Sequence, residues 1–365
     1  MRVNSQVKKY YRDDLQIIRG LAVSAVVLFH LNEKMFSFGY LGVDCFFVIS
    51  GYVVTPLIIK IFVGSESKTY NLKYFFKRRF YRLAPALMVV LILSAVSIFL
   101  LASPVEHKRF ASQGIATLLL IGNIGAYRYN SDYFNPNPNP LVHTWSLSVE
   151  EQIYIALPFL LSIIFYKFRF TLKRLLTVYL AICVLSLSLF LSPKSLMPLY
   201  STLGINNIEV FSFYSSFSRV WEFAVGGIVY FLSYKNNKQK VFNKQIVFFF
   251  ILIFGIVLLR TAPASILVVF ITTLVIFFKA LDELPNVMKT ILKWIGDRSY
   301  SIYLIHLPVI YIARYPISIS VSSDSNKFWR AVLALFFIAL VGSLIYSKVE
   351  SPFRNAYKNN FFSLR

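Results

Sequence analysis

Long apolar runs separated by short polar segments recur along the whole sequence. A helix needs ~20 mostly apolar residues to cross the ~30 Å hydrocarbon core of a bilayer. The runs therefore predict an all-α integral membrane protein with about ten transmembrane helices, forming a single domain over residues 1–365. The predicted spans lie near residues 14–31, 40–62, 83–102, 149–166, 175–192, 218–233, 245–260, 264–279, 299–315 and 328–347.

The basic residues gather in the polar segments between these runs. Hydrophobic residues make up 57% of the 365 and charged residues only 15%, which excludes an ordinary water-soluble domain. With both termini in the cytosol, the cytosolic segments carry 26 Lys and Arg and the outward loops about eight, as the positive-inside rule requires. The net charge of +22 is therefore a sign of topology and not of nucleic-acid binding.

Two outward segments, residues 103–148 and 193–217, are long enough to receive a substrate from outside the cell. The first contains an apolar stretch at 115–124 that is too short for a span, so we expect it to re-enter the membrane or lie on its surface. Alternating Asn and Pro at 135–140 exclude a helix there, because each Pro disfavours the helical conformation of the residue before it. A stiff extended loop is expected.

The first span carries two ionisable residues, Arg19 and His30, and such residues inside a membrane are functional candidates by default. Eleven residues make about three helical turns, so the two share one face some 16 Å apart, Arg19 near the inner surface and His30 near the outer one. The small residues between them allow close approach by another helix. The alternative is that Arg19 only reaches the cytosolic interface and that His30 caps the helix.

The second span begins with a carboxylate, Asp44, at the same outer level as His30. It is placed either to orient an imidazole or to cap its own helix. Further along, Ser50 and Gly51 are interpreted as a close-packing point and not as a nucleophile, since no Gly-x-Ser-x-Gly elbow surrounds them.

Residues 75–82 combine four cations with four aromatic residues at the cytosolic face. Arg78, Arg79 and Arg82 would suit the phosphates of a nucleotide-bearing cofactor, and the aromatic rings its base. Anchoring to lipid headgroups is the alternative.

Further polar groups lie at the outer ends of later spans. Glu150 and Glu151 are adjacent at the mouth of one span and should face the protein interior. Arg219 and Glu222, three residues apart, are spaced for an ion pair. Trp145, Ser146, Tyr303 and His306 are supporting candidates, His306 also being compatible with simple packing.

Taken together, these motifs resemble the acyltransferase-3 family of membrane proteins, which includes O-antigen and exopolysaccharide O-acetyltransferases. The resemblance is carried by Arg-x10-His at 19–30, Gly-Tyr-Leu-Gly-Val-Asp at 39–44, Phe-Lys-Arg-Arg at 76–79, His-Thr-Trp-Ser-Leu-Ser-Val-Glu-Glu-Gln at 143–152 and Ser-Tyr-Ser-Ile-Tyr-Leu-Ile-His at 299–306. Each motif alone is weak, but together they cover essentially the whole chain.

The resemblance implies transfer of an acetyl or other short acyl group from cytosolic acetyl-CoA to a sugar hydroxyl of a surface or lipid-linked glycan, in the inner membrane of a bacterium. It also implies that the extra SGNH-type domain of some relatives is lacking here. His30 would act as general base, helped by Asp44 or Glu150, or as a nucleophile, and Arg19 would hold the donor with the arginines at 78–82.

No metal is expected in this reaction, because Cys45 and Cys183 fall inside apolar runs and form no ligand pattern. The competing function is a glycan-precursor flippase, in which the same polar groups would line a translocation path. The two halves of the chain offer no matching pair of broken helices, which disfavours an inverted-repeat transporter. The oligomeric state is left open.

Overall fold

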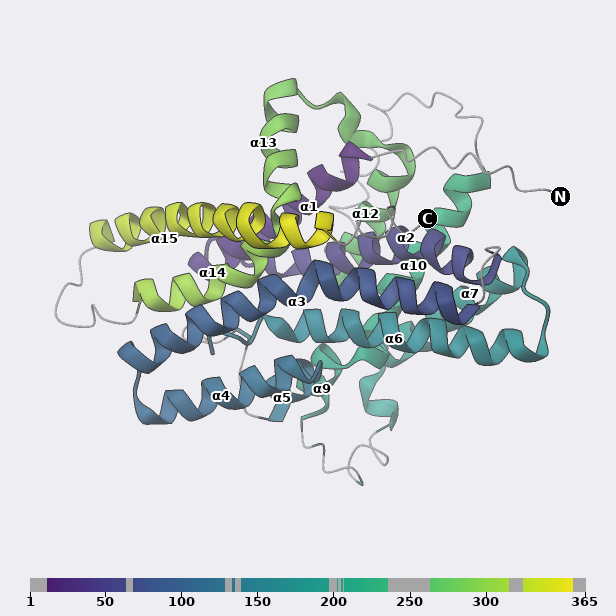
Figure 1. Ribbon diagram of the computed structural model, residues 1–365, viewed down its shortest axis with the longest axis horizontal. Coiled ribbons are helices and arrows are strands. Elements are labelled where there is room, and N and C mark those ends of the chain that lie inside the picture. Colours follow the sequence, from purple (N-terminus) through teal and green to yellow (C-terminus); the bar gives the residue numbers. More distant parts are fainter. Residues whose placement is uncertain are drawn as a thin grey trace.

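The computed structural model of the chain is a bundle of helices (Figure 1). The structure describes residues 12–63, 68–128, 133–134, 139–196, 202, 205, 207–235, 263–314 and 324–356, and these residues contain no β-strand. The all-α prediction is therefore confirmed for this part of the chain.

Six helical segments are long and apolar enough to cross a membrane: 13–31, 39–63, 71–101, 144–167, 172–191 and 328–356. They belong to α1 (Asp13–Leu31), α2 (Gly42–Val63) with the 3-10 turn η1 (Gly39–Leu41) before it, α3 (Lys68–Leu101), α6 (Thr144–Lys167), α7 (Leu172–Leu191) and α15 (Asp324–Ile345). A π-helical turn, η4 (Tyr346–Glu350), extends α15. Each of the six coincides with a predicted span.

Three further predicted spans are also helices: α10 (Ser216–Lys235), α12 (Ala264–Phe278) and α14 (Ser299–Arg314). The last two, of 15 and 16 residues, are shorter than the ~20 residues of a perpendicular span. The predicted span at 245–260 lies outside the described residues. The count of ten spans and the orientation of the termini therefore stay predictions.

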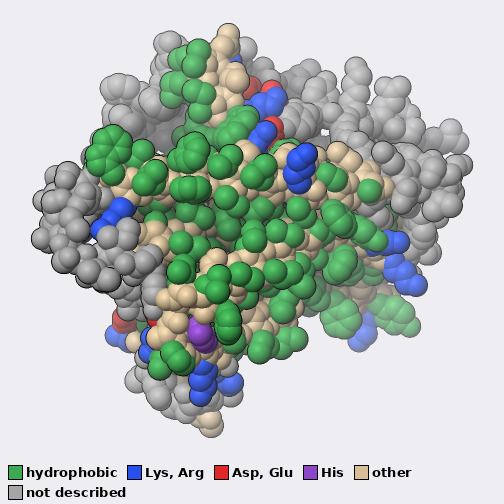
Figure 2. All heavy atoms as spheres, turned by 60° about the vertical axis from the view of Figure 1, so that its left-hand side comes forward, with side chains coloured by type: hydrophobic (Ala, Val, Ile, Leu, Met, Phe, Trp, Pro, Cys, Tyr) green, Lys and Arg blue, Asp and Glu red, His purple; other side chains and the backbone are tan. Residues whose placement is uncertain are grey.

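Large apolar side chains cover the outside of the long helices. Phe99 of α3 is 74% exposed and Phe159 of α6 is 68% exposed, and Leu185 and Phe336 continue the pattern on α7 and α15. Figure 2 shows this apolar surface, with Lys and Arg mainly toward its margins. A contiguous apolar surface of this kind is stable when lipid, and not water, surrounds it.

The helices cross closely where a glycine removes the side chain between them. A Cβ atom on Gly51 of α2 would overlap the backbone oxygen of Phe223 in α10, and one on Gly20 of α1 would overlap that of Leu292. The prediction that Ser50 and Gly51 mark a packing point is confirmed at Gly51. The small residues between Arg19 and His30 likewise admit neighbouring backbone.

The apolar stretch at 115–124 is divided between two short helices, α4 (Pro104–Leu118) and α5 (Gly122–Arg128). The chain turns at Leu120, whose φ of 59° is left-handed. The side-chain amide of Gln113 donates to the carbonyl of Gly122 at 2.9 Å, and the backbone N–H of Gly122 donates to Ser148 Oγ of α6 at 3.0 Å. The stretch is thus a helical hairpin against α6 and not a span.

The segment at 280–298, expected to be a cytosolic loop, contains the helix α13 (Asn286–Asp297). In Figure 1 it runs across the direction of the long helices, and it packs against α1 where Gly296 meets the backbone of Gln16. A search for apolar runs misses this helix, because it contains Lys residues and is only 12 residues long. A helix that lies across the bundle needs only one apolar side.

Candidate functional site

His30 lies at the last turn of α1, where it is buried and its Nε2 atom has no hydrogen-bond partner among the described residues. Its ring centroid is 4.7 Å from that of Tyr133 and 5.0 Å from that of Phe29. Arg314, at the end of α14, donates to the carbonyl oxygens of His30 and Leu31. This arginine, which the sequence patterns did not single out, therefore caps α1 and fixes the backbone of His30.

Two more buried histidines accompany His30. The ring of His306 lies 5.4 Å from that of His30, and the ring of His143 lies 4.8 Å from that of His306. His306 was predicted as a supporting residue, whereas His143 was not selected although it opens the His-Thr-Trp-Ser motif. Its position just before α6 gave no sign that it would be buried beside α14.

Backbone hydrogen bonds fix the protonation of these two rings. His306 Nδ1 lies 2.5 Å from the carbonyl oxygen of Tyr303, and His143 Nε2 lies 3.1 Å from that of Leu304. A carbonyl only accepts, so each of these nitrogens carries a proton and donates it. The other nitrogen, Nε2 of His306 and Nδ1 of His143, has no hydrogen-bond partner among the described residues.

Two more unpaired polar atoms belong to residues beside this cluster, since the Tyr133 ring centroid lies 4.7 Å from that of His30 and 6.2 Å from that of Trp145. The Tyr133 hydroxyl and the Trp145 indole N–H are both buried without a partner in the described part of the chain. Burial also raises the pKa of Tyr133 above that of a free phenol, so this hydroxyl is neutral. Buried polar atoms are nearly always hydrogen-bonded, and a group of exceptions in one place marks a site for a polar ligand.

Ser146 and Tyr303 hold the cluster in place. Their hydroxyl oxygens are 2.7 Å apart, and the Tyr303 hydroxyl also donates to the backbone oxygen of His143 at 2.8 Å. These bonds tie the start of α6 to α14. The two supporting candidates are thus placed together with the histidines, as structural partners of the cluster.

Asp44 is paired with Arg219, and the role predicted for it beside His30 stays a prediction. The Arg219 guanidinium lies 3.0 Å from the Asp44 carboxylate and 2.9 Å from that of Glu222, and all three side chains are at most 2% exposed. The predicted ion pair between Arg219 and Glu222 is confirmed. Aromatic rings surround it, with the guanidinium 5.8 Å from the centroid of Trp145.

Glu150 was expected near His30 at the outer end of a span, and this placement is wrong. The helix α6 begins at Thr144, so Glu150 lies more than one turn inside it. Its carboxylate accepts from Ser50 Oγ at 2.7 Å and from the Tyr154 hydroxyl at 2.6 Å, and Arg79 lies 3.9 Å away.

Arg79 also pairs with Glu151 at 2.5 Å, and its guanidinium lies 3.1 Å from the centroid of the Tyr154 ring. Both glutamates face the protein interior, as predicted. The arginines at 78–82, in contrast, do not form one group: Arg79 is committed to two carboxylates, and Arg78 is exposed.

Arg82 instead belongs with Arg19. The electrostatic neighbours of Arg19 are Arg82, Glu150 and Glu350, so Arg19 lies at the inner polar group while His30 lies at the other end of the same helix. Glu350, which was not predicted, is buried in the π-helical turn and accepts from Ser301 Oγ at 2.7 Å. Single π-turns in helices often occur at functional sites.

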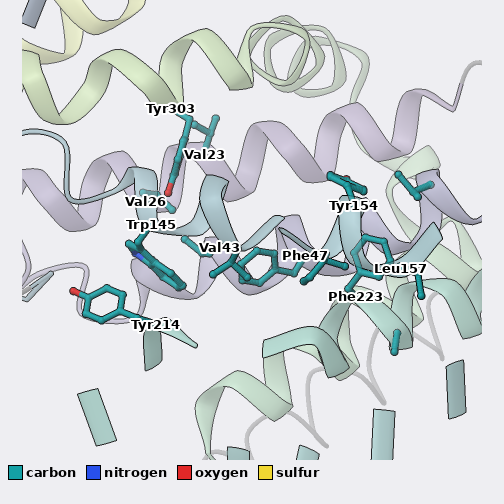
Figure 3. Close-up of a cluster of buried hydrophobic side chains, with 14 of the residues drawn as sticks. Val23, Val26, Val43, Phe47, Trp145, Tyr154, Leu157, Tyr214, Phe223 and Tyr303 are labelled. Atoms are coloured by element: carbon teal, nitrogen blue, oxygen red, sulfur yellow. The ribbon is translucent and has the colours of Figure 1, made fainter. Parts of the chain in front are cut away.

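An apolar layer separates the two polar groups. Figure 3 shows Val43 and Phe47 of α2 between Trp145 and Tyr303 on one side and Tyr154 on the other. Valines of α1, Val23 and Val26, belong to the same buried cluster. Among the described residues, no group of three or more His, Cys, Asp or Glu is arranged to hold a metal ion.

Comparison with known proteins places the chain among acyltransferases. It is 28% identical over 392 residues to the peptidoglycan O-acetyltransferase OatA of Listeria monocytogenes, an alignment that covers 100% of this chain and 58% of the relative. It is 27% identical over 381 residues to the O-acetyltransferase OatA of Staphylococcus aureus, covering 97% of this chain and 59% of the relative. A putative O-acetyltransferase of Staphylococcus aureus is 29% identical over 373 residues, with 95% and 58% covered.

The chain thus spans less than three fifths of the length of these curated relatives. No solved structure matches it. The acyltransferase domain of the acyltransferase-3 family matches residues 12–348. This range includes every motif on which the resemblance rests and both polar groups except Glu350. The chain therefore belongs to the acyltransferase-3 family.

Proposed function

We propose that the chain is a multi-pass O-acyltransferase of a bacterial plasma membrane. It transfers an acetyl or other short acyl group from cytosolic acyl-CoA to a sugar hydroxyl of a cell-envelope glycan. The observation that carries the proposal is the unpartnered Nε2 atom of buried His30, in a cluster with two further imidazoles that each have one unpartnered nitrogen among the described residues. A neutral imidazole with a free lone pair is the form that a general base requires.

In the direct reaction, the acceptor hydroxyl attacks the carbonyl carbon of the thioester while His30 Nε2 takes its proton. The carbon–sulfur bond then breaks, and the CoA thiolate leaves and receives the proton from the imidazolium. The products are the sugar ester and the CoA thiol. In the alternative, His30 attacks the thioester first, the carbon–sulfur bond breaks, and CoA leaves as the thiol with the proton of the imidazole. The acceptor hydroxyl then attacks the acyl-imidazole, and its proton returns to the imidazole as the sugar ester forms.

The donor and the acceptor reach this site from opposite sides. With both termini in the cytosol, Arg19 faces the inner surface and His30 the outer half of the membrane. The ~16 Å between them along α1 is of the order of the length of a pantetheine arm. The apolar layer between the two polar groups suits such an arm better than a hydrated sugar, which favours acyl transfer over glycan transport.

The names of the relatives support a choice of acceptor glycans to test. The Listeria monocytogenes relative is named a peptidoglycan O-acetyltransferase, so peptidoglycan is one acceptor to test, and O-antigen or exopolysaccharide are the others.

The test replaces His30 by Ala and compares it with His107→Ala. His107 is the fourth histidine of the chain and lies on α4, where its ring stacks on Phe99 away from the cluster. Mass spectrometry of peptidoglycan fragments and of exported polysaccharide should show that H30A leaves the glycan at the surface but unacylated, and that H107A is acylated normally. Unchanged acylation in H30A would refute the proposal, and loss of the glycan from the surface would favour a flippase.

The two chemical routes are separated by one further measurement. Purified protein is mixed with acetyl-CoA labelled in the acetyl group, without any glycan. Direct transfer predicts no label on the protein, whereas the acyl-imidazole route predicts a burst of labelled enzyme that H30A lacks.

A further inference from the structure

A second group of cations lies where α13, α14 and the end of α15 meet. The Arg298 guanidinium carbon is 4.2 Å from the ring centroid of Trp294 and 4.9 Å from that of Tyr346. On the same tyrosine, the guanidinium carbon of Arg354 is 5.7 Å from the ring centroid, and Arg354 Nη2 lies 3.4 Å from the hydroxyl. Two arginines thus share one aromatic ring.

The anionic partners of this group are few among the described residues. Arg354 lies 3.8 Å from Glu350, whose other carboxylate oxygen already accepts from Ser301. Arg298 donates to the backbone oxygen of Trp294 at 3.1 Å, but its Nε–H is buried without a partner in the described part of the chain. A buried guanidinium N–H without an acceptor costs free energy unless a ligand supplies one.

The group is continuous with the inner polar group of the site. Glu350 is an electrostatic neighbour of both Arg19 and Tyr300, and Arg82 is a neighbour of the same two residues. Arg354, with 40% of its side chain exposed, is the outermost member, and Arg19 is the innermost. Arg354, Arg82 and Arg19 therefore lie around Glu350, from the surface toward α1, and Arg298 shares the Tyr346 ring with Arg354.

We propose that Arg298 and Arg354, with Trp294 and Tyr346, bind the phosphates and the heteroaromatic base of the nucleotide that carries the acyl group. Several arginines give bidentate contacts to phosphate, and flat aromatic rings offer surfaces on which a base stacks. The inference rests on the proposed function. It assigns the nucleotide site to the helix α13 and the π-helical turn, and not to Arg78 or to Arg79, whose partners are carboxylates.

Phospholipid headgroups share the phosphate chemistry, so the lipid must be controlled. Purified chain is placed in nanodiscs of phosphatidylcholine alone or with added phosphatidylglycerol. Isothermal titration calorimetry then measures the affinity for CoA, for 3′-dephospho-CoA and for pantetheine. The variants are Arg298→Gln, Arg354→Gln and Arg298→Lys, and each is checked by size-exclusion chromatography. Arg174→Gln is the matched control, since Arg174 is an exposed arginine at the start of α7 near Phe168.

The site predicts that R298Q and R354Q each weaken CoA binding about tenfold in phosphatidylcholine, since one charge-assisted contact is lost. R298K should weaken it less, because a point charge remains. Pantetheine affinity should stay the same in all variants, and R174Q should bind CoA like the unaltered chain. If R298Q and R354Q are each well folded and bind CoA as tightly as the unaltered chain, the inference is overturned.

An affinity change seen only in nanodiscs with phosphatidylglycerol would also overturn it, since the arginines would then bind lipid. If the unaltered chain binds no CoA in either lipid, acyl-CoA is not the donor, and the proposed function is wrong as well as the position of the site. If the unaltered chain binds CoA while R298Q and R354Q bind it equally well, only the position of the site is wrong. The two failures are therefore distinguishable.

Discussion

Replacing Arg219 by Met removes the cation that lies between the buried carboxylates of Asp44 and Glu222. Its guanidinium lies 3.0 Å from Asp44 and 2.9 Å from Glu222, and none of the three side chains is more than 2% exposed. Met has a similar length, so the change alters charge far more than volume. The two carboxylates would then face apolar and aromatic surroundings without a counter-charge.

Breaking a buried ion pair by removing one partner costs about 3–5 kcal/mol, most of it the cost of an uncompensated charge. Neutralising the whole set should therefore recover stability. We expect R219M to lose about that much free energy of unfolding, and the triple variant with Asp44→Asn and Glu222→Gln to recover at least half of the loss. The recovery is incomplete because the buried amides need new partners.

Titration with sodium dodecyl sulfate in mixed micelles measures the free energy of unfolding of each variant. Glu209→Gln is the control, since its pair with Lys194 has both side chains more than 70% exposed and should add nothing measurable. A triple variant as unstable as R219M would refute the reasoning, because charge compensation would then not be the cause. Acyl transfer by a stable triple variant would show that Asp44 is structural and does not serve His30.

The remaining predictions concern the histidine cluster and the helix crossing. His306→Gln and His143→Gln should each lower the rate of acyl transfer about a hundredfold, because His306 lies beside the reacting imidazole of His30 and His143 lies beside His306, while CoA affinity measured by calorimetry stays constant. A rate as high as that of the unaltered chain would mean that both histidines are only packed. Gly51→Leu should cost about 1–3 kcal/mol or more, because its side chain would overlap the backbone of Phe223 and force α2 away from α10. Gly114→Ala, where a Cβ atom would lie 3.6 Å from its nearest neighbour, should be tolerated in the same detergent titration.

Much of the fold could be predicted from the sequence, because a bilayer imposes a simple rule on length and polarity. All the predicted spans that fall within the described residues coincide with helices. The helix α13 was not predicted, because it has only 12 residues and contains two Lys; it packs against α1. The stretch at 115–124 was expected to re-enter the membrane or lie on its surface, and only the structure shows its division between α4 and α5 against α6.

The candidate residues were also predictable, since ionisable side chains inside a membrane are rare and costly. Their grouping was not. The sequence analysis placed Asp44 and Glu150 at the outer level with His30. In the structure, the crossing of α2 with α10 brings Asp44 to Arg219. Because α6 already begins at Thr144, Glu150 lies inside the helix and beside Arg79.

His143 and Arg298 illustrate the same limit. Neither has a local signal that separates it from other polar residues near helix ends, and each acquires a neighbour from a distant part of the chain: His143 lies beside His306, and Arg298 lies over the Tyr346 ring. Hydrophobic periodicity along the chain therefore determined which segments are helices, and the motifs identified the family. Only the tertiary structure decided which charges meet, because ion pairs and imidazole contacts between helices depend on crossing points and rotations that no single helix encodes.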